Sequence, residues 1–304
     1  MSLGRPYTMD IDSCIQDGWL TFQDIKTNIL DRDFLYYLLS QSKTQAIFTS
    51  ISAGSGVQNL KKETVSGVVL SIPPLPEQNR IVSVLETWDK AIENLNKKIE
   101  IKKQIKKGLM QDLLTGKKRL SGFKDKWEVK KLADICNKEN SDVSSNTLDF
   151  NNGNYPIYGA SGFIKNIDFY RQNKSYISII KDGAGVGRLT LHKAQTSVLG
   201  TLNILHENTN SDLMFLYFLL QIIDFKKYMV GSTIPHIYFR DYKKEKITVP
   251  NIKEQNAIAD ILTMSDKEIT ELENKLLIIK EQKRYLLNNL ITGAIRTPET
   301  LLVK

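Results

Sequence analysis

The segment KDGAGVGR (181–188) is the clearest pattern in this sequence that could carry chemistry. A glycine-rich loop after a strand can hold a dinucleotide or S-adenosylmethionine, because glycine lets the backbone approach the ligand closely. That use requires a helix directly after the loop, so that the helix N-terminus faces the anion. The residues that follow, 188–205, are typical of strands. The loop is therefore predicted to be a β-turn close to a ligand or to DNA, with a stand-alone methyltransferase using residues 183–187 as the alternative.

Other catalytic patterns are missing from the sequence. The three histidines, His192, His206 and His236, are too scattered for a metal set, and no Cys/His pair has ligand spacing. There is no phosphate-binding GxxxxGK[ST] loop and no Asn/Asp-Pro-Pro-aromatic tetrapeptide. Cys14 and Cys136 lie far apart, so we expect two free, buried thiols in a reducing cytosol. The sequence therefore offers no supported catalytic set and no supported metal site.

Basic, aromatic and small polar residues are interleaved between residues 155 and 250, which suits DNA binding. Cationic side chains contact phosphates, and polar side chains read base edges. A solvated basic face is the alternative for any single residue. The residues expected to contact DNA are Tyr158, Ser161, Lys165, Lys181, Arg188, His192, Lys193, Ser232, Thr233, His236, Tyr238, Arg240, Lys243 and Lys244.

The charge distribution agrees with a polyanionic partner. The chain of 304 residues has a formal net charge of +8 and a pI near 9.2. By segment, the net charge is −1 over residues 1–75, +5 over 76–120, +4 over 121–250 and 0 over 251–304. The positive excess therefore lies in the middle of the chain.

Short strands and one helix must position these residues. Runs rich in β-branched and aromatic residues predict strands, with turn residues between them. The predicted strands are YPIYG (155–159), SYISIIK (175–181), RLTLH (188–192), SVLGTLNIL (197–205) and KITVP (246–250). Residues 211–229 are predicted to form one apolar helix, capped by Ser211 or Asp212. The pattern indicates an α+β domain of mixed topology.

An internal repeat organises the whole chain. Residues 72–119 align with residues 249–296 without a gap, and 19 of the 48 positions are identical. The tripeptide Glu-Gln-Asn occurs at the same place in each copy, at 77–79 and 254–256. Upstream, FLYYLLS (34–40) corresponds to FLYFLLQ (215–221). The second copy extends further upstream than the first, so the first is expected to lack about 60 residues of its beginning.

Each copy ends in a long predicted helix of about 40 residues, or roughly 60 Å. Asn251 and Glu254 predict a capping box at the start of the second helix. Thr115-Gly116 and Thr292-Gly293 predict the ends of the two helices. Apolar residues at 3–4 spacing predict that the helices pair as an antiparallel coiled coil; two independent helices are the alternative. The predicted seam comprises Ile81, Leu85, Trp88, Ile92, Leu95, Ile99, Leu109, Leu113, Ile258, Leu262, Ile269, Leu272, Leu276, Ile279, Leu286 and Leu290, interrupted by Lys102, Lys106, Ser265 and Lys283.

The chain is expected to be cytoplasmic and free of membrane contact. Its longest apolar run, near residues 215–223, is less than half of the roughly 20 residues that span a bilayer. No basic-then-apolar leader opens the sequence, so no secretory signal is expected.

These motifs resemble the specificity subunit of type I restriction–modification systems. The resemblance covers nearly the whole chain. It is carried by IPPLPEQNRIVSVL and VPNIKEQNAIADIL at the helix starts, LLTGKKRL and LITGAIRT at the helix ends, YPIYGASGFI, and GSTIPHIYFRDYKKEKITVP. The resemblance implies five segments: a truncated first target recognition domain (1–75), a spacer helix (76–120), a complete second target recognition domain (121–250), a second spacer helix (251–297) and a C-terminal tail (298–304).

The resemblance further implies a non-catalytic subunit that reads a bipartite site, or one half of it, in double-stranded DNA. Methyltransferase and restriction subunits are the implied partners, and S-adenosylmethionine, ATP and Mg are expected on those subunits. Because the first domain departs from the family pattern, we expect residues 121–250 to read the sequence. Self-association through the coiled coil is a further hypothesis. A coiled-coil DNA-binding repressor remains a second alternative.

Overall fold

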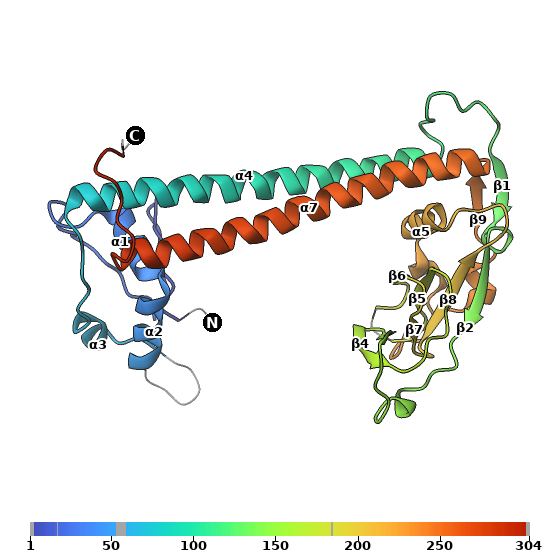
Figure 1. Cartoon of the computed structure of the whole chain (residues 1–304), viewed down its shortest axis with the longest axis horizontal. Coiled ribbons are helices and arrows are strands. Elements are labelled where there is room, and N and C mark those ends of the chain that lie inside the picture. The colour runs from blue at the N-terminus through green and yellow to red at the C-terminus, as the bar shows by residue number, and fades with distance from the viewer. Residues whose placement is uncertain (1–2, 17, 53–58, 184, 302–304) are drawn as a thin grey trace. The chain divides into compact units, whose positions relative to one another are not determined.

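The structure, a computed structural model, describes residues 3–16, 18–52, 59–183 and 185–301. Two compact units divide the chain: unit 1 comprises Met1–Glu100 and Thr270–Lys304, and unit 2 comprises Ile101–Ile269. Part of each of the two long helices, α4 (Leu75–Leu114) and α7 (Ile252–Ile291), belongs to each unit (Figure 1). Among the described residues, no helix has the length and apolar character needed to cross a membrane.

The described part of unit 1 is built from helices. Besides the segments of α4 and α7, it contains α1 (Arg32–Ser40), α2 (Ser42–Ile51) and α3 (Lys62–Ser66). Asp31 caps α1 by accepting a hydrogen bond from the Phe34 amide at 2.8 Å. The core of the unit brings α1 against both long helices, through buried residues that include Phe34, Leu38, Leu85 and Leu290. In the segment GSGVQNL (54–60), residues 54–58 lie outside the described residues.

Unit 2 has mixed helix and sheet, which confirms the predicted α+β class. A four-stranded antiparallel sheet has the order β2-β8-β5-β6, a three-stranded sheet has the order β4-β3-β7, and β1 pairs with β9. Helix α5 packs on the four-stranded sheet and contributes Phe215, Leu216 and Phe218 to the core. The strands are β1 (Glu128–Lys131), β2 (Cys136–Asn140), β3 (Tyr155–Gly159), β4 (Gly162–Ile167), β5 (Tyr176–Ile180), β6 (Leu189–His192), β7 (Ser197–Val198), β8 (Leu202–Glu207) and β9 (Lys246–Val249).

The predicted helix over 211–229 is wrong in its length. Helix α5 (Leu213–Ile222) ends where Ile223 adopts an extended backbone, and a separate 3-10 turn, η3 (Phe225–Tyr228), follows. The break occurs because the Asp224 carboxylate accepts a hydrogen bond from the Lys226 amide at 3.0 Å and starts the new turn. The remaining short elements are η1 (Leu132–Asp134), η2 (Ser145–Thr147) and α6 (Phe239–Tyr242).

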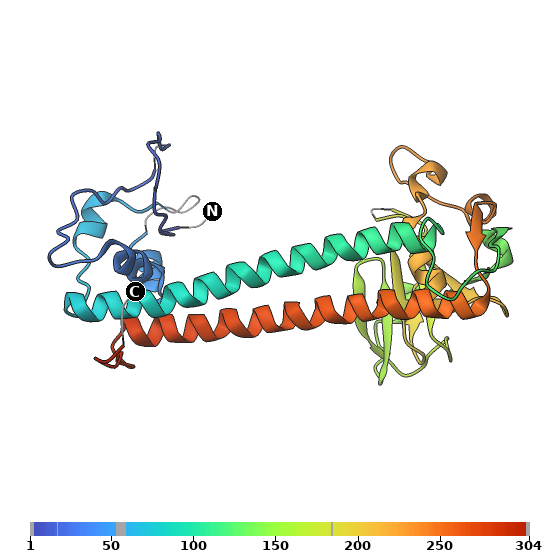
Figure 2. The same ribbon diagram turned by 90° about the horizontal axis from the view of Figure 1, so that it is seen from above.

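Helices α4 and α7 pack against each other in opposite directions (Figures 1 and 2). In unit 2 Lys106 pairs with Asp266, and in unit 1 Asp89 pairs with Lys283. All sixteen predicted seam residues are buried or half-buried. The helices end at Leu114 and Ile291, as predicted from Thr115-Gly116 and Thr292-Gly293, and Gly116 and Gly293 adopt positive φ values of 71° and 74°.

Two of the lysines that interrupt the seam occupy equivalent positions in the two copies. The Lys106 ammonium lies 2.5 Å from the Asp266 carboxylate and 5.3 Å from the centroid of the Phe218 ring. The Lys283 ammonium lies 2.5 Å from the Asp89 carboxylate and 5.3 Å from the centroid of the Tyr37 ring. Each charged group therefore meets an opposite charge and an aromatic face, which explains how a lysine is accommodated in an apolar seam.

The repeated glutamine joins each long helix to the smaller helix beside it. Gln78 donates to the carbonyls of Ile29 and Pro73 and accepts from the Asp31 amide, each at 2.8 Å. Gln255 repeats this pattern: it donates to the carbonyls of Asn210 and Pro250 and accepts from the Asp212 amide at 3.1 Å. Both glutamines are almost fully buried. The glutamine thus fixes the chain segment that leads into α1 or α5.

The repeated glutamate forms an ion pair, and the predicted capping box is only half present. Asn251 accepts a hydrogen bond from the Glu254 amide, but the Glu254 carboxylate turns to Arg119, whose Nε and Nη2 lie 2.6 and 2.7 Å away. Trp127 also donates to Glu254 at 3.1 Å. In unit 1, Arg296 donates in the same manner to both carboxylate oxygens of Glu77. A bidentate arginine is a stronger partner for a buried carboxylate than the N-cap amide.

Candidate nucleic-acid interface

Three loops of unit 2 that are distant in sequence meet at one place. The glycine-rich loop between β5 and β6 binds the loop 230–238 through two backbone hydrogen bonds, from Gly183 to Pro235 and from Ile237 to Lys181, each 2.9 Å long. Arg188 reaches the β3–β4 hairpin, where its Nη1 lies 3.4 Å from the Ala160 carbonyl oxygen. Most of the predicted DNA-contacting residues belong to these three loops, so the fold brings them together.

The glycine-rich loop is a turn between two antiparallel strands, as predicted. The Gly187 amide donates to the Ile180 carbonyl at 2.9 Å, and β6 follows directly. A Cβ atom on Gly185, which has φ of 95°, would lie 2.5 Å from Nη2 of Arg188. The positive φ is what requires glycine at this position, because the flexible end of Arg188 could move away from a Cβ atom. Ala184 lies outside the described residues.

The loop 230–238 presents a histidine and a tyrosine over the glycine-rich loop. The Nδ1 atom of His236 lies 2.8 Å from the Asp182 carboxylate, which fixes the orientation of the imidazole. The Tyr238 ring stacks beside His236, with centroids 6.5 Å apart, and the Arg240 guanidinium lies 4.8 Å from the Tyr238 centroid. An ordered cation above an exposed aromatic ring provides both a phosphate ligand and a flat apolar surface.

His192 differs from the expectation that it contacts DNA. It is 5% exposed, its Nε2 lies 2.8 Å from the Ser178 hydroxyl, and its ring stacks on Tyr176 with centroids 4.8 Å apart. Alternation along β6 places His192 on the face opposite to Leu189 and Leu191, which pack on the α5 core. His192 is nevertheless buried, because the rings of Tyr158 and Tyr176 cover it. Its role here is to support Tyr158, whose ring centroid is 4.7 Å away.

The other predicted residues differ in exposure. Lys165 donates to the Leu148 carbonyl at 2.9 Å and thereby ties the loop after η2 to β4. The exposed residues are Ser161, Arg188, Lys193, Ser232, Thr233, Tyr238, Arg240 and Lys244, and the half-buried ones are Tyr158, Lys165, Lys181, His236 and Lys243. DNA contact by each of these side chains stays a prediction.

Sequence reasoning missed three residues of this surface. Asp182 orients His236, and Phe163 and Ile234 expose 60% and 56% of their surface beside the basic residues. Phe163 lies in the quoted motif YPIYGASGFI, directly after the turn glycine. An aromatic residue next to a hairpin turn is a usable signal, because turn residues are seldom buried. Nothing in the sequence identifies the partner of Asp182, which is 54 residues away.

The burial of His192 predicts a pH-dependent stability of unit 2. Burial lowers the pKa of His192 to about 4, from an ordinary value of about 6.5. The unfolded chain therefore binds the proton first as the pH falls. We expect unit 2 to lose about 3 kcal/mol of unfolding free energy between pH 6.5 and pH 4 through this residue. Urea unfolding of His192→Phe should show a smaller loss over this pH range.

Ser178→Ala is the matched control for this experiment. It removes the hydrogen bond to His192 and keeps the titrating imidazole, so its pH dependence should follow that of the unchanged chain. Equal slopes for the unchanged chain and His192→Phe would contradict the assignment.

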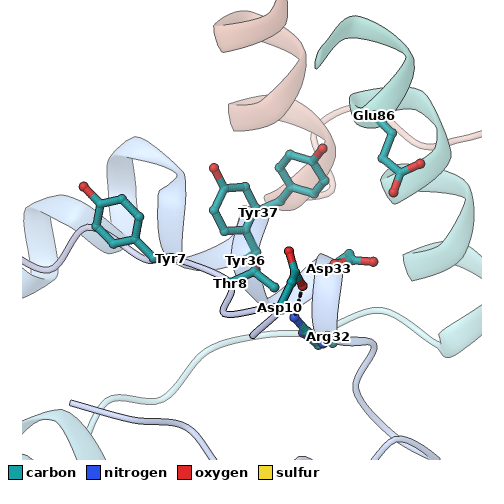
Figure 3. Close-up of a pocket in the computed structure, with 8 residues that line it drawn as sticks. All are labelled: Tyr7, Thr8, Asp10, Arg32, Asp33, Tyr36, Tyr37 and Glu86. Carbon is teal, nitrogen blue, oxygen red and sulfur yellow. Dashed lines mark hydrogen bonds and ion pairs between the residues drawn. The ribbon is translucent and has the colours of Figure 1, made fainter. Parts of the chain in front are cut away.

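Unit 1 carries a pocket of a different chemical character (Figure 3). Its volume is about 510 Å³, and its lining residues are Tyr7, Thr8, Asp10, Arg32, Asp33, Tyr36, Tyr37 and Glu86. The Arg32 guanidinium is paired with Asp10 at 2.9 Å. The lining therefore carries an excess of carboxylates, which disfavours phosphate. This pocket has none of the basic character of the three loops in unit 2.

One carboxylate of this pocket is expected to cost stability at neutral pH. Desolvation, followed by the charges of Asp31 and Glu86, raises the pKa of Asp33 above its usual value. A carboxyl group with a raised pKa ionises more easily in the unfolded chain than in the folded protein. The unfolding free energy therefore falls as the pH rises from the usual aspartate pKa through the raised one. Asp33→Asn should raise the melting temperature at pH 7 by about 1 °C. Asp10→Asn, which breaks the pair with Arg32, is the control and should produce no rise.

The cysteines carry no visible chemistry. Cys136 is buried, and desolvation raises the pKa of its thiol to about 12, which disfavours the reactive thiolate. Cys14 is exposed, so the expectation that both thiols are buried is wrong for this residue. It lies in a segment without regular structure, where no apolar core covers it. No cluster of His, Cys, Asp or Glu in the described ranges has the arrangement of a metal site.

Comparisons with known proteins agree on one family. A family model described as type I restriction modification DNA specificity domain matches residues 4–103 and 124–281. The chain is 26% identical over 308 residues to the type I restriction enzyme MjaVIII specificity subunit of Methanocaldococcus jannaschii, covering 89% of this chain and 72% of that protein. It is 25% identical over 287 residues to a putative type I restriction enzyme specificity subunit of Haemophilus influenzae, with coverages of 84% and 70%.

Solved structures share the fold. The crystal structure of the S subunit of a type I restriction–modification system from M. genitalium superposes with a TM-score of 0.62 at 20% identity, covering 88% of this chain and 74% of that chain. A structure of a type I system, described in terms of complex assembly and conformational transition, gives a TM-score of 0.59 at 17% identity, with coverages of 88% and 72%.

Proposed function

Because this chain belongs to the type I restriction modification DNA specificity family, we infer that it is the non-catalytic subunit that recognises DNA sequence in a type I system. The main observation that supports DNA recognition by unit 2 is that three of its loops meet at one place. They bring together the exposed Arg188, the half-buried Lys165 and Lys181, and the exposed rings of Phe163 and Tyr238. The family does not support the alternatives of a stand-alone methyltransferase or a repressor.

We propose that the loops of unit 2 read one half of the DNA site. Arg188 and Arg240 are the side chains with the geometry for bidentate hydrogen bonds to guanine in the major groove. Lys193, Lys243 and Lys244 lie on flanking segments and suit phosphate contacts, which give affinity without sequence preference. The buried His192 and the half-buried His236 keep their neighbours in position.

The proposed partner subunits are inferred from the family and from the similarity between the two copies of the repeat at the ends of the helix pair. We propose that methyltransferase subunits, and with them restriction subunits, dock on this chain. S-adenosylmethionine, ATP and Mg would be held by those partners. The matching hydrogen bonds of Gln78 and Gln255 support this proposal. They hold the start of each long helix in the same way, so both copies of the repeat can offer a similar surface to a partner subunit. Self-association through the coiled coil remains a further proposal.

Methylation mapping tests the proposed function. The chain would be expressed with its methyltransferase subunit in a host without other methylation, and the methylated bases would be mapped across the genome. We expect one defined sequence to be methylated, and we expect methylation to disappear when the specificity gene is removed. Methylation without the specificity gene, or at no defined sequence, would contradict the proposal.

S-adenosylmethionine binding separates the subunit from an independent methyltransferase. The isolated chain should show no stoichiometric binding in calorimetry, while its complex with the methyltransferase subunit should bind. Tight binding by the isolated chain would favour an enzyme that uses the loop 183–187.

A further inference from the structure

A column of four aromatic rings runs from the core of unit 2 to its surface. Tyr176 on β5 is fully buried and stacks on His192 of β6, with centroids 4.8 Å apart and planes at 19°. His192 packs on Tyr158 of β3 at 4.7 Å, and Tyr158 meets Phe163 of β4 edge-on at 6.0 Å. The column thus joins four strands and ends at a ring that is 60% exposed.

Hydrogen bonds hold the inner end of the column. Thr196 donates to the Tyr176 hydroxyl at 3.0 Å, and the His192 ring bonds the Ser178 hydroxyl at 2.8 Å. Burial also keeps the imidazole neutral at physiological pH, because it lowers the pKa of His192 to about 4. Two of the four rings are therefore fixed in place, and the outer two rings rest on them.

The backbone around Phe163 departs from a regular strand pair. Strand β4 is the edge strand of the three-stranded sheet, and the register between β3 and β4 shifts at Ile157/Tyr158. Such irregularities turn side chains out of the regular pleat. Gly162, which precedes Phe163, has φ of 107°, and a Cβ there would meet no atom within 4 Å. The glycine before the ring is therefore not packed against other residues, and the ring itself is 60% exposed.

The surroundings of Phe163 suit nucleic acid. A single exposed apolar side chain is common on protein surfaces. The Phe163 ring differs, because it packs on rings that reach into the core. It also belongs to the β3–β4 hairpin that Arg188 contacts. An arginine and an exposed aromatic ring at one hairpin match the chemistry of a duplex, in which phosphates flank stacked bases. Proteins that deform DNA insert such apolar wedges between base steps.

We propose that Phe163 is a wedge that inserts its ring at a base step within the half-site read by unit 2, unstacks that step and kinks the duplex. This proposal rests on the proposed DNA-reading function. The ring column keeps Phe163 in position while it is inserted, because each ring packs against the next one and the innermost rings are buried. The wedge would add sequence specificity at base pairs that no side chain contacts through hydrogen bonds. Pyrimidine–purine steps unstack more easily than other steps, so sites that contain such a step at the wedge would bind more tightly.

Fluorescence of 2-aminopurine tests the wedge. The full chain, assembled with its methyltransferase subunits, would be mixed with a duplex that contains the mapped methylation site. 2-Aminopurine would replace one base at a time, at every position except the methylated one. We expect binding to increase the fluorescence at one step of the half-site. Phe163→Ala should abolish this increase and weaken binding about 10- to 100-fold.

Two further variants keep the test decisive. Phe163→Trp retains a flat apolar ring and should preserve the increase. Phe150→Ala is the matched control, because Phe150 is 99% exposed and its ring has no aromatic neighbour within the described segments. It should bind and unstack the duplex like the unchanged chain.

The outcomes separate the wedge from the proposed function. An unchanged fluorescence increase in Phe163→Ala would overturn the wedge. Normal unstacking combined with weaker association of the methyltransferase subunit would also overturn it, because Phe163 would then be a contact between proteins. Failure of the unchanged complex to bind the duplex at all would instead contradict the DNA-reading function.

Discussion

Replacing Gln255 by leucine is expected to lower the unfolding free energy of unit 2 by about 3 kcal/mol. The side chain makes hydrogen bonds to the Asp212 amide and to the carbonyls of Asn210 and Pro250, and it is 2% exposed. Leucine has a similar volume but leaves these three backbone groups without their partner in a buried place. Each unsatisfied group costs about 1 kcal/mol or more. Urea unfolding followed by circular dichroism would measure the loss.

The same substitution in the first copy should have the same effect on unit 1. Gln78 is fully buried and makes three hydrogen bonds of 2.8 Å, so Gln78→Leu is expected to cost about as much. The adjacent residues Asn79 and Asn256 are exposed and supply matched controls within the same tripeptide. Alanine at these positions should change stability by less than about 0.5 kcal/mol. Equal costs for glutamine and asparagine substitutions would contradict the prediction.

Arg188→Ala should weaken binding to the mapped DNA site about 10- to 100-fold and relax the sequence preference at one base pair. The guanidinium is exposed at the junction of the glycine-rich loop and the β3–β4 hairpin. A bidentate contact to guanine is worth about 1–3 kcal/mol of discrimination against other bases. Fluorescence anisotropy with the native site and with single-base variants would measure both effects.

Arg188→Lys distinguishes base reading from phosphate contact. Lysine keeps the charge but cannot form the bidentate fork. We expect Arg188→Lys to keep the salt dependence of binding and to lose the base preference. If lysine restores both affinity and preference, Arg188 contacts a phosphate and not a base.

The long helices could be predicted from the sequence because the repeat aligns without a gap. Identical residues at equal spacing, including Leu85/Leu262 and Leu113/Leu290, give the seam directly. The alternation of β-branched and aromatic residues gave four of the five predicted strands for the same reason: these signals are local. The predicted strand over 197–205 is wrong, because the chain leaves β7 (Ser197–Val198) and enters β8 (Leu202–Glu207) in a different sheet. The ends of the helices could also be predicted, because the glycines that follow Thr115 and Thr292 are local signals, and both adopt the left-handed conformation.

The partners of the polar residues could not be predicted, because they are distant in sequence. The Glu254 carboxylate has a good local partner in the N-cap amide, yet Arg119, 135 residues away, takes it. Periodicity over the four residues of β6 did not reveal that the face opposite to Leu189 and Leu191 is also covered at His192, so His192 was expected at the surface. The convergence of the three loops depends on the strand order β4-β3-β7 and β2-β8-β5-β6, which local patterns do not contain.

The reciprocal ion pairs make one copy of the repeat self-complementary. Glu77 lies at the start of α4 and Arg119 follows its end, so a single helix cannot join its own two residues. Two identical copies laid in opposite directions would satisfy both pairs, and the pairs of Lys106 with Asp266 and of Lys283 with Asp89 follow the same rule. A chain encoding one copy alone would therefore carry both halves of its own dimer interface. Duplication of such a gene would turn a homodimer into a single chain without redesigning any contact.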